Sequence, residues 1–345
     1  MIYGQKFLTT TNESMVKDPL MSFSILESSV TELDNIFNFC FNENTIIYEA
    51  SIKEIFSNLL EKVKGIIIKI LGWIKTAIEF VTGKVLDFIQ KLVNHLSKNE
   101  AALTEAENDK EKKYYYYDIK KDDALKTKDG HYVDSIINIY VKSMGEELIE
   151  DFEEVESDYR NHNKYVSSGF KGDDNYLDKH YNEYLKRIEE AISVLNEANE
   201  KDILKKTEFS SNFDKMFITY FNEDVAKLRA TDRTVKEFES KFKHIENVNK
   251  KINSIVTSDS SEYKRDLQTY INGLYSYSAK YISLVPKAVT KYLGILNKAT
   301  KYNVKTIIQI AVSQGFDKDK LADFKKSANE FAEGKEEPGT YFKLA

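Results

Sequence analysis

The chain has 345 residues, enough for one large domain or two smaller ones with a full hydrophobic core. Its 13 glycines and 3 prolines are too few for a turn-rich β-sandwich or an alternating βαβ fold, so the composition predicts an all-α protein. A net charge of −6 is not that of a general nucleic-acid binder, and the single cysteine excludes a disulfide framework within the chain and a cysteine-based zinc site.

Residues 1–50 form an acidic N-terminal segment, with two lysines and seven acidic residues. The first residues lack the charged-then-apolar layout of a secretory signal, so we expect no signal peptide. Apolar residues recur at helical spacing from Met21 to about Phe41 and predict a helix there. The run Asn42-Glu43-Asn44 predicts a break after it.

Residues 51–98 reverse this charge, with eight lysines and four acidic residues. Apolar residues advance by three or four over some thirteen turns, which predicts one long basic amphipathic helix with one or two hinges at its glycines. Because no segment reaches about 18 uninterrupted apolar residues, we expect no membrane span. The regular apolar row consists of Ile52, Phe56, Leu59, Val63, Ile67, Ile70, Ile74, Ala77, Val81, Val85, Phe88, Leu92 and Leu96.

The sequence leaves three interpretations open for this helix. Its apolar face can pack in the protein's own core, dock on a partner protein, or lie in a membrane interface. Ordinary packing explains most such apolar rows, but the length of the helix and its charge reversal add weight to a special role. The candidate partner or membrane face comprises Val63, Ile67, Ile70, Trp73, Ile74, Val81 and Phe88.

Residues 99–130 change character and predict a charged linker between two domains. Four consecutive tyrosines, Tyr114 to Tyr117, lie within it and cannot all face one core. Residues 131–333 return to helical periodicity and predict an antiparallel helical bundle, with a kink at Pro286. We expect residues 334–345 to form a mobile tail. The predicted fold is therefore a long amphipathic N-terminal helix followed by an antiparallel bundle.

The sequence contains no catalytic, cofactor-binding or metal-binding signature. None of its five histidines has a ligand spacing, and the common phosphate-binding and nucleophile motifs do not occur. Most of the 22 tyrosines fall on apolar helical rows, where packing explains them better than stacking on nucleic acid bases. We therefore expect a non-enzymatic protein with no cofactor and no specific nucleic acid binding.

The layout of the first 110 residues or so resembles internal head proteins of large tailed phages that infect low-GC Gram-positive bacteria. The features that carry the resemblance are Glu-Ser-Ser-Val at Glu27–Val30, then Ile46-Ile47-Tyr48-Glu49-Ala50, then the basic helix. In that family a prohead protease cuts after the glutamate of a Leu/Ile-x-Glu sequence, before a small residue. The resemblance implies two cleavage sites that flank the basic helix: Ile47, Glu49 and Ala50, and Leu103, Glu105 and Ala106.

The resemblance implies a structural or internal virion protein, made in the host cytoplasm and packaged in the capsid, with a removable N-terminal module. Its partners would be other virion proteins or further copies of itself. The resemblance also allows the mature part to leave the capsid with the DNA. Two other functions stay open. The chain could be a membrane-active or pore-forming protein that uses residues 51–98, or a cytoplasmic helical adaptor.

Overall fold

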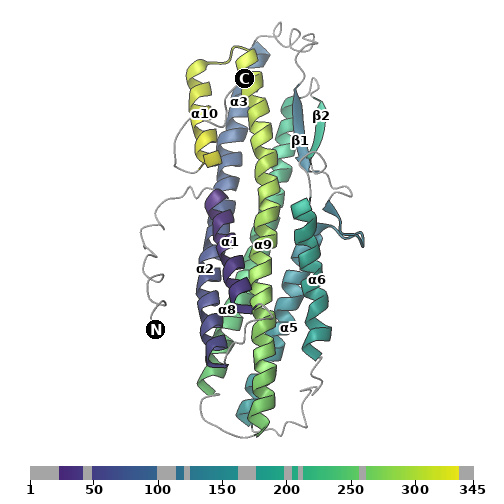
Figure 1. The fold of residues 1–345 in the computed structure, drawn as a ribbon. Coiled ribbons are helices and arrows are strands. Elements are labelled where there is room, and N and C mark those ends of the chain that lie inside the picture. The colour runs from purple at the N-terminus through teal and green to yellow at the C-terminus, as the bar shows by residue number, and fades with distance from the viewer. Residues whose placement is uncertain are drawn as a thin grey trace.

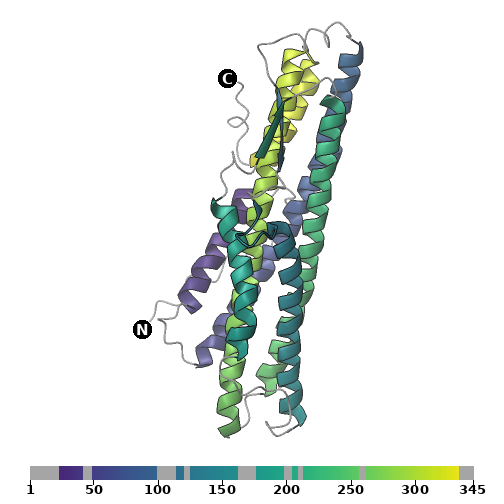
Figure 2. The ribbon, with the colours of Figure 1, turned by 90° about the vertical axis from the view of Figure 1, so that its right-hand side faces the viewer.

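A computed structural model describes residues 23–41, 49–98, 114–119, 125–161, 176–197, 204–208, 213–255 and 262–333. These residues form long helices that lie side by side in an elongated rod, with one small ribbon of two strands (Figures 1 and 2). The prediction of an all-α bundle is confirmed. The helices are α1 (Phe23–Phe41), α2 (Glu49–Glu79), α3 (Leu86–Lys98), α5 (Val133–Asn161), α6 (Tyr176–Glu197), α8 (Phe213–Ile255), α9 (Glu262–Ser313) and α10 (Lys318–Glu333).

Helix α9 runs through the centre of the rod and contacts most of the other helices (Figure 1). Its 52 residues correspond to about 78 Å at the usual rise per residue. The helix continues through Pro286, which costs one backbone hydrogen bond because proline has no N–H. Burial on several sides offsets that cost, since tertiary packing supplies most of the stability of a helix. Its buried apolar residues include Ile271, Leu274, Tyr281, Val285, Leu293, Leu296, Val304 and Ile307.

Side-chain contacts fix the relative directions of the helices. Helices α1 and α2 are antiparallel: Lys62 of α2 pairs with Glu32 of α1, while Lys69, further along α2, reaches back to Ser29. Helices α5 and α8 are parallel instead, since Lys241 pairs with Glu146, and Lys251, further along α8, pairs with Glu156. The bundle therefore mixes antiparallel neighbours with parallel ones.

The predicted basic helix is real, but it is not a separate module. It comprises α2 and α3, joined by a π-helical segment, η2 (Phe80–Val85), that contains Gly83. The hinge expected at a glycine is thus a locally widened turn, and the chain stays helical through Gly65 and Gly72. The apolar side of this helix belongs to the same hydrophobic core as α5, α6, α8 and α9.

The predicted linker, residues 99–130, contains a strand that the sequence did not indicate. Strand β1 (Tyr115–Ile119) pairs antiparallel with β2 (Leu204–Glu208), with Tyr117 opposite Lys206. The ribbon lies against α9 near the upper end of the rod in Figure 1. Local propensity could not reveal this pairing because the partner strand lies more than eighty residues away. The predicted tail, residues 334–345, lies outside the described residues.

Candidate functional site

The predicted partner or membrane face of the basic helix lies inside the bundle. Its members are at most 4% exposed, and they are Val63, Ile67, Ile70, Trp73, Ile74, Val81 and Phe88. Trp73 packs between Phe23 of α1 and Phe331 of α10, with ring centroids 5.2 and 6.2 Å away. Among the large apolar residues that the structure shows as exposed, only Ile68 belongs to α2 or α3. Contact of this face with a membrane or a partner would require the helix to leave the bundle. Such contact stays a prediction.

The basic side of α2 meets the acidic helix α1. The Lys62 ammonium lies 2.8 Å from the Glu32 carboxylate, and the Lys69 ammonium donates a hydrogen bond of 2.6 Å to the Ser29 hydroxyl. Lys287 of α9 lies 2.8 Å from Asp34. The Lys287–Asp34 pair is about three-quarters buried, so solvent screens it less than the exposed Lys62–Glu32 pair. The acidic N-terminal segment and the basic helix thus carry opposite charges partly because they pair with each other within one molecule.

Helix α1 lies on the outside of the rod, packed against α2, α9 and α10 (Figures 1 and 2). Its apolar residues that the structure shows as buried are Phe23, Leu26, Val30 and Leu33. Phe23 approaches α9 at Gly294, where an added Cβ atom would lie only 3.2 to 3.3 Å from the phenyl ring. We name this surface the α1 groove and define it by Trp73, Gly294 and the lysines Lys62, Lys69 and Lys287.

The structure describes part of the first candidate cleavage site and none of the second. Glu49 and Ala50 are the first two residues of α2, directly after the connection from α1. Ile47, Leu103, Glu105 and Ala106 lie outside the described residues. The cleavage pattern also matches at Glu27 in α1 and at Glu190 in α6, both inside helices, and at Glu197, the last residue of α6.

A buried polar cluster joins α8, α9 and the ribbon. The Asp224 side chain is 1% exposed, and its Oδ2 atom accepts a hydrogen bond of 3.3 Å from the Thr300 hydroxyl. Its Oδ1 atom lies 3.8 Å from the Lys227 ammonium. Lys227 also lies 3.4 Å from Asp118 of β1, so one lysine serves two carboxylates. Burial raises the pKa of the Asp224 carboxyl to about 6, although Lys227 opposes the shift.

The tyrosine run belongs to the same end of the bundle. Tyr116 packs against Phe217 and Tyr220 of α8, while Tyr117 stacks on Tyr302 of α9 with ring centroids 4.9 Å apart. Tyr114, Tyr116 and Tyr117 are partly buried and all pack against the hydrophobic core. Alternate side chains of a strand point to opposite sides, which lets neighbouring tyrosines reach different helices.

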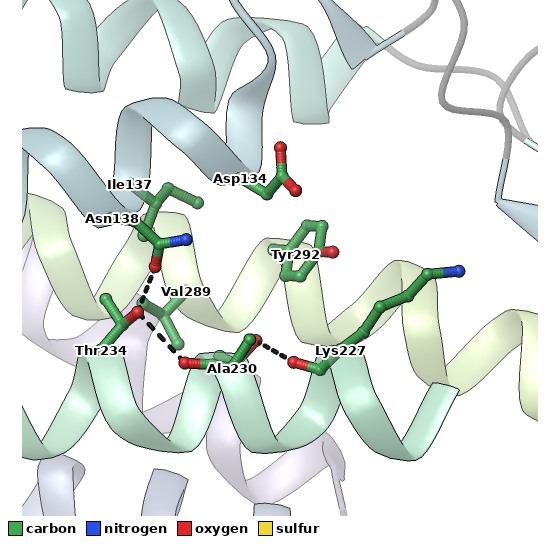
Figure 3. A pocket seen from close by; sticks show the side chains of 9 residues that line it. Asp134, Ile137, Asn138, Lys227, Ala230, Thr234, Val289 and Tyr292 are labelled. Atoms are coloured by element: carbon green, nitrogen blue, oxygen red, sulfur yellow. Dashed lines mark hydrogen bonds between the residues drawn. The ribbon is translucent and has the colours of Figure 1, made fainter. Parts of the chain in front are cut away.

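A small cavity adjoins the polar cluster between α5, α8 and α9 (Figure 3). Its volume is about 70 Å³, well below the several hundred Å³ of a typical small-molecule site. Asn138, Thr234 and Tyr292 line it, and the Thr234 hydroxyl donates a hydrogen bond to Asn138 Oδ1 (Figure 3). The Lys227 ammonium extends away from these two residues (Figure 3). The cavity has room for water-sized molecules, not for an organic substrate.

A second hollow lies at the surface between α3 and α10. Its volume is about 230 Å³, and the stacked rings of Phe88 and Phe324 form part of its lining. Lys84, Lys91 and Lys320 line it together with Asp87 and Asp323, so charges of both signs surround it.

The described residues contain no group of three or more His, Cys, Asp or Glu side chains arranged to hold a metal ion. Within the same ranges, no helix combines the length and apolar character needed to cross a bilayer. Family models, curated proteins and solved structures yielded no match to this chain.

Sequence reasoning missed the residues that organise the polar cluster. Asp224 falls in an apolar row of α8 together with Tyr220, Phe221, Val225 and Leu228, all of which are buried. An acidic residue at an apolar helical position is a signal that could have identified it. Asn303 of α9 makes hydrogen bonds with the backbone of Tyr117 in β1. It carried no such signal, because this role depends on a strand that reaches it from elsewhere in the chain.

Proposed function

We propose that this chain is a non-enzymatic structural or internal protein of a tailed-phage virion, and that cleavage after Glu49 removes its N-terminal segment. The observation that carries the proposal is the position of α1. This helix lies on the outside of the rod, and the candidate cleavage site follows it directly at the start of α2. Cutting there would release an acidic helix and leave every other described element in place.

The depth of packing supports the first cleavage site over the second. Cleavage after Glu105 would also remove α2, η2 and α3. Their buried side chains form a large part of the core against α8 and α9, and exposing a single large apolar side chain costs roughly 2 kcal/mol. A chain that begins at Ala106 would lose many such contacts. The removable module in this proposal is therefore residues 1–49, shorter than the 105 residues that the second site would release.

The shape of the molecule supports a structural role. One hydrophobic core links helices over the whole length of the rod, from Phe56 beside Tyr275 to Phe88 beside Phe324. Such packing makes a long, stiff body, because well-packed interiors deform little. A stiff rod is suited to a component that fills the interior of a particle or holds other components at a fixed distance.

The decisive experiment is to determine the N-terminus of the protein in gradient-purified particles by mass spectrometry. The proposal expects a chain that begins at Ala50. Presence in particles with an intact N-terminus would refute the processing, and absence from particles would refute the virion location. Absence would favour the cytoplasmic adaptor instead.

A matched pair of variants tests the cleavage site itself. Glu49→Gln removes the carboxylate before the scissile bond, whereas Glu54→Gln makes the same change five residues later in α2. Particles that carry Glu49→Gln should retain the acidic segment, and particles that carry Glu54→Gln should process it normally. Equal processing of both would place the cut elsewhere.

The membrane-active alternative has a separate test. It requires α2 and α3 to leave the bundle, so the full chain should release dye from liposomes, and Trp73→Glu should abolish the release. A full chain that leaves liposomes intact would count against this alternative.

A further inference from the structure

We infer that the α1 groove is an interaction surface between copies of this chain, and that its second occupant is α1 of another copy. In this arrangement two molecules exchange their α1 helices, and each groove binds the helix of its partner. The inference goes beyond the proposed function, because the exchange requires neither cleavage nor a virion.

The groove is built for one particular helix. Its floor receives Phe23, Leu26, Val30 and Leu33, which recur at helical spacing along one side of α1. Gly294 makes room for the Phe23 ring, since any side chain at this position would press on it. The ring also meets Trp73 edge-on at 5.2 Å. These contacts favour an aromatic residue at the first turn of the bound helix.

The rim of the groove selects charge. Lys62 and Lys69 of α2 and Lys287 of α9 present three ammonium groups to the bound helix. They meet Glu32, Ser29 and Asp34 in turn. A basic helix placed here would bring like charges within a few ångströms of one another, which is unfavourable. The occupant is therefore an acidic amphipathic helix with a leading aromatic residue, a description that α1 itself fits.

The position of α1 in the fold permits exchange. Among the described elements α1 contacts α2, α9 and α10 and pairs with neither strand, so side-chain packing holds it in place. Residues 42–48 connect it to α2, and a chain of that length can span about 25 Å when extended. The same contacts form whether α1 comes from its own chain or from a neighbour. Exchange of an identical element is a low-cost route to dimers.

Concentration then decides which form dominates. The two arrangements share their contacts at the groove, so the dimer loses mainly the translational and rotational freedom of one molecule. We expect monomers in dilute solution and exchanged dimers where copies are crowded together. Such crowding is the condition inside an assembling particle.

Charge reversal favours exchange in a mixture of two variants and so makes the exchange measurable. One variant, the groove variant, carries Lys62→Glu and Lys287→Glu. The other, the helix variant, carries Glu32→Lys and Asp34→Lys. Each variant alone opposes its own α1 with like charge, but a mixture restores both pairings across two molecules. Sedimentation velocity should show monomers of 40.0 kDa for each variant alone and a doubled mass for the equimolar mixture.

A control on the opposite side of α2 isolates the groove. Helical spacing places Lys64 and Lys75 away from Lys62 and Lys69, and both are exposed. A chain with Lys64→Glu and Lys75→Glu makes the same charge change outside the groove, so its mixture with the helix variant should stay monomeric. A chain that carries all four groove and helix reversals should behave like the unaltered protein.

Two results would overturn the inference. One is a mixture of the groove and helix variants that stays monomeric at high concentration, although the chain with all four reversals melts like the unaltered protein. Normal melting of that chain would show that the reversed ion pairs form within one molecule. A monomeric mixture would then show that they do not form between two molecules. The other is a mass increase that is equally large with the control variant, since it would locate the association outside the groove. Circular dichroism of each variant confirms that the bundle is folded.

Discussion

The Asn303 side chain binds both backbone groups of Tyr117. Its Oδ1 atom accepts a hydrogen bond of 2.7 Å from the Tyr117 N–H, and its Nδ2 atom donates one of 2.8 Å to the Tyr117 carbonyl. An amide side chain thus takes the place of a neighbouring strand on one edge of β1, and β2 covers the other edge. Asn303 is fully buried, so the ribbon is attached to α9 by a pairing that water does not screen.

We expect Asn303→Ala to destabilise the protein by about 1–3 kcal/mol, because it leaves the Tyr117 N–H and carbonyl without partners. Asn303→Asp should cost more, since it places a carboxylate against the Tyr117 carbonyl. Urea denaturation measures both effects, and the exposed Gln309→Ala on the same helix is the control. Hydrogen exchange at the Tyr117 amide should accelerate before global unfolding. Unchanged exchange there would show that the ribbon does not depend on Asn303.

We expect Asp224→Asn to stabilise the protein at neutral and alkaline pH. The pKa of Asp224 in the folded chain, about 6, lies above its ordinary value of 3.8, because burial disfavours the charged form. The folded chain therefore binds this proton more tightly than the unfolded chain does, and the unaltered protein loses stability as pH rises from 4 to 6. By linkage the difference amounts to about 3 kcal/mol above pH 6.

Thermal melts of both forms between pH 4 and pH 8 measure this difference. The advantage of Asp224→Asn should be full above pH 6 and should shrink toward zero at pH 4. An advantage that does not vary with pH would arise from packing, not from titration of this group.

The two ion pairs of α1 should contribute unequally. We expect Asp34→Asn to weaken the docking of α1 by about 1 kcal/mol and Glu32→Gln by only a few tenths, because Lys287 and Asp34 are less exposed than Lys62 and Glu32. Hydrogen exchange of the α1 amides should report both changes while the core of α9 stays protected. Equal effects of the two substitutions would show that burial does not set the strength of the two ion pairs.

Trp73 provides an optical measure of the same docking. It is the single tryptophan of the chain, it is 3% exposed, and α1 covers it through Phe23. Phe23→Ala should shift its fluorescence to longer wavelength and increase quenching by acrylamide, because water gains access to the indole ring. Leu195→Ala in α6, a buried position away from α1, serves as the control. Identical quenching in all three proteins would mean that α1 does not shield Trp73.

Two helical glycines should respond to alanine in opposite directions. At Gly145 an added Cβ atom would lie 2.6 Å from the Tyr281 hydroxyl, which donates a hydrogen bond of 2.6 Å to the Val141 carbonyl. Gly145→Ala should therefore destabilise the protein by about 1–3 kcal/mol through overpacking. At Gly65 nothing lies within 4 Å, so Gly65→Ala should stabilise it by up to about 1 kcal/mol through helix propensity. Urea denaturation of the two variants side by side checks the opposite signs.

The sequence alone determined the helical class of the fold and the buried side of the long helices, but not the strands β1 and β2. Periodic apolar residues such as Ile67, Ile70 and Ile74 must face away from water, and their spacing permits only a helix. Scarce glycine and proline pointed to the same all-α answer. These properties are local, since a helix makes its hydrogen bonds and its amphipathic face within one segment.

Only the tertiary structure decided what each buried side packs against. An apolar face has no directional preference, so the sequence could not distinguish a core, a partner or a membrane as the contact of Trp73. The acidic segment and the basic helix looked like two modules in the sequence, whereas Glu32 and Asp34 of α1 pair with Lys62 and Lys287 across the groove. The strand at Tyr117 and the burial of Asp224 likewise depend on residues far away in the chain, and only folding brings those residues together.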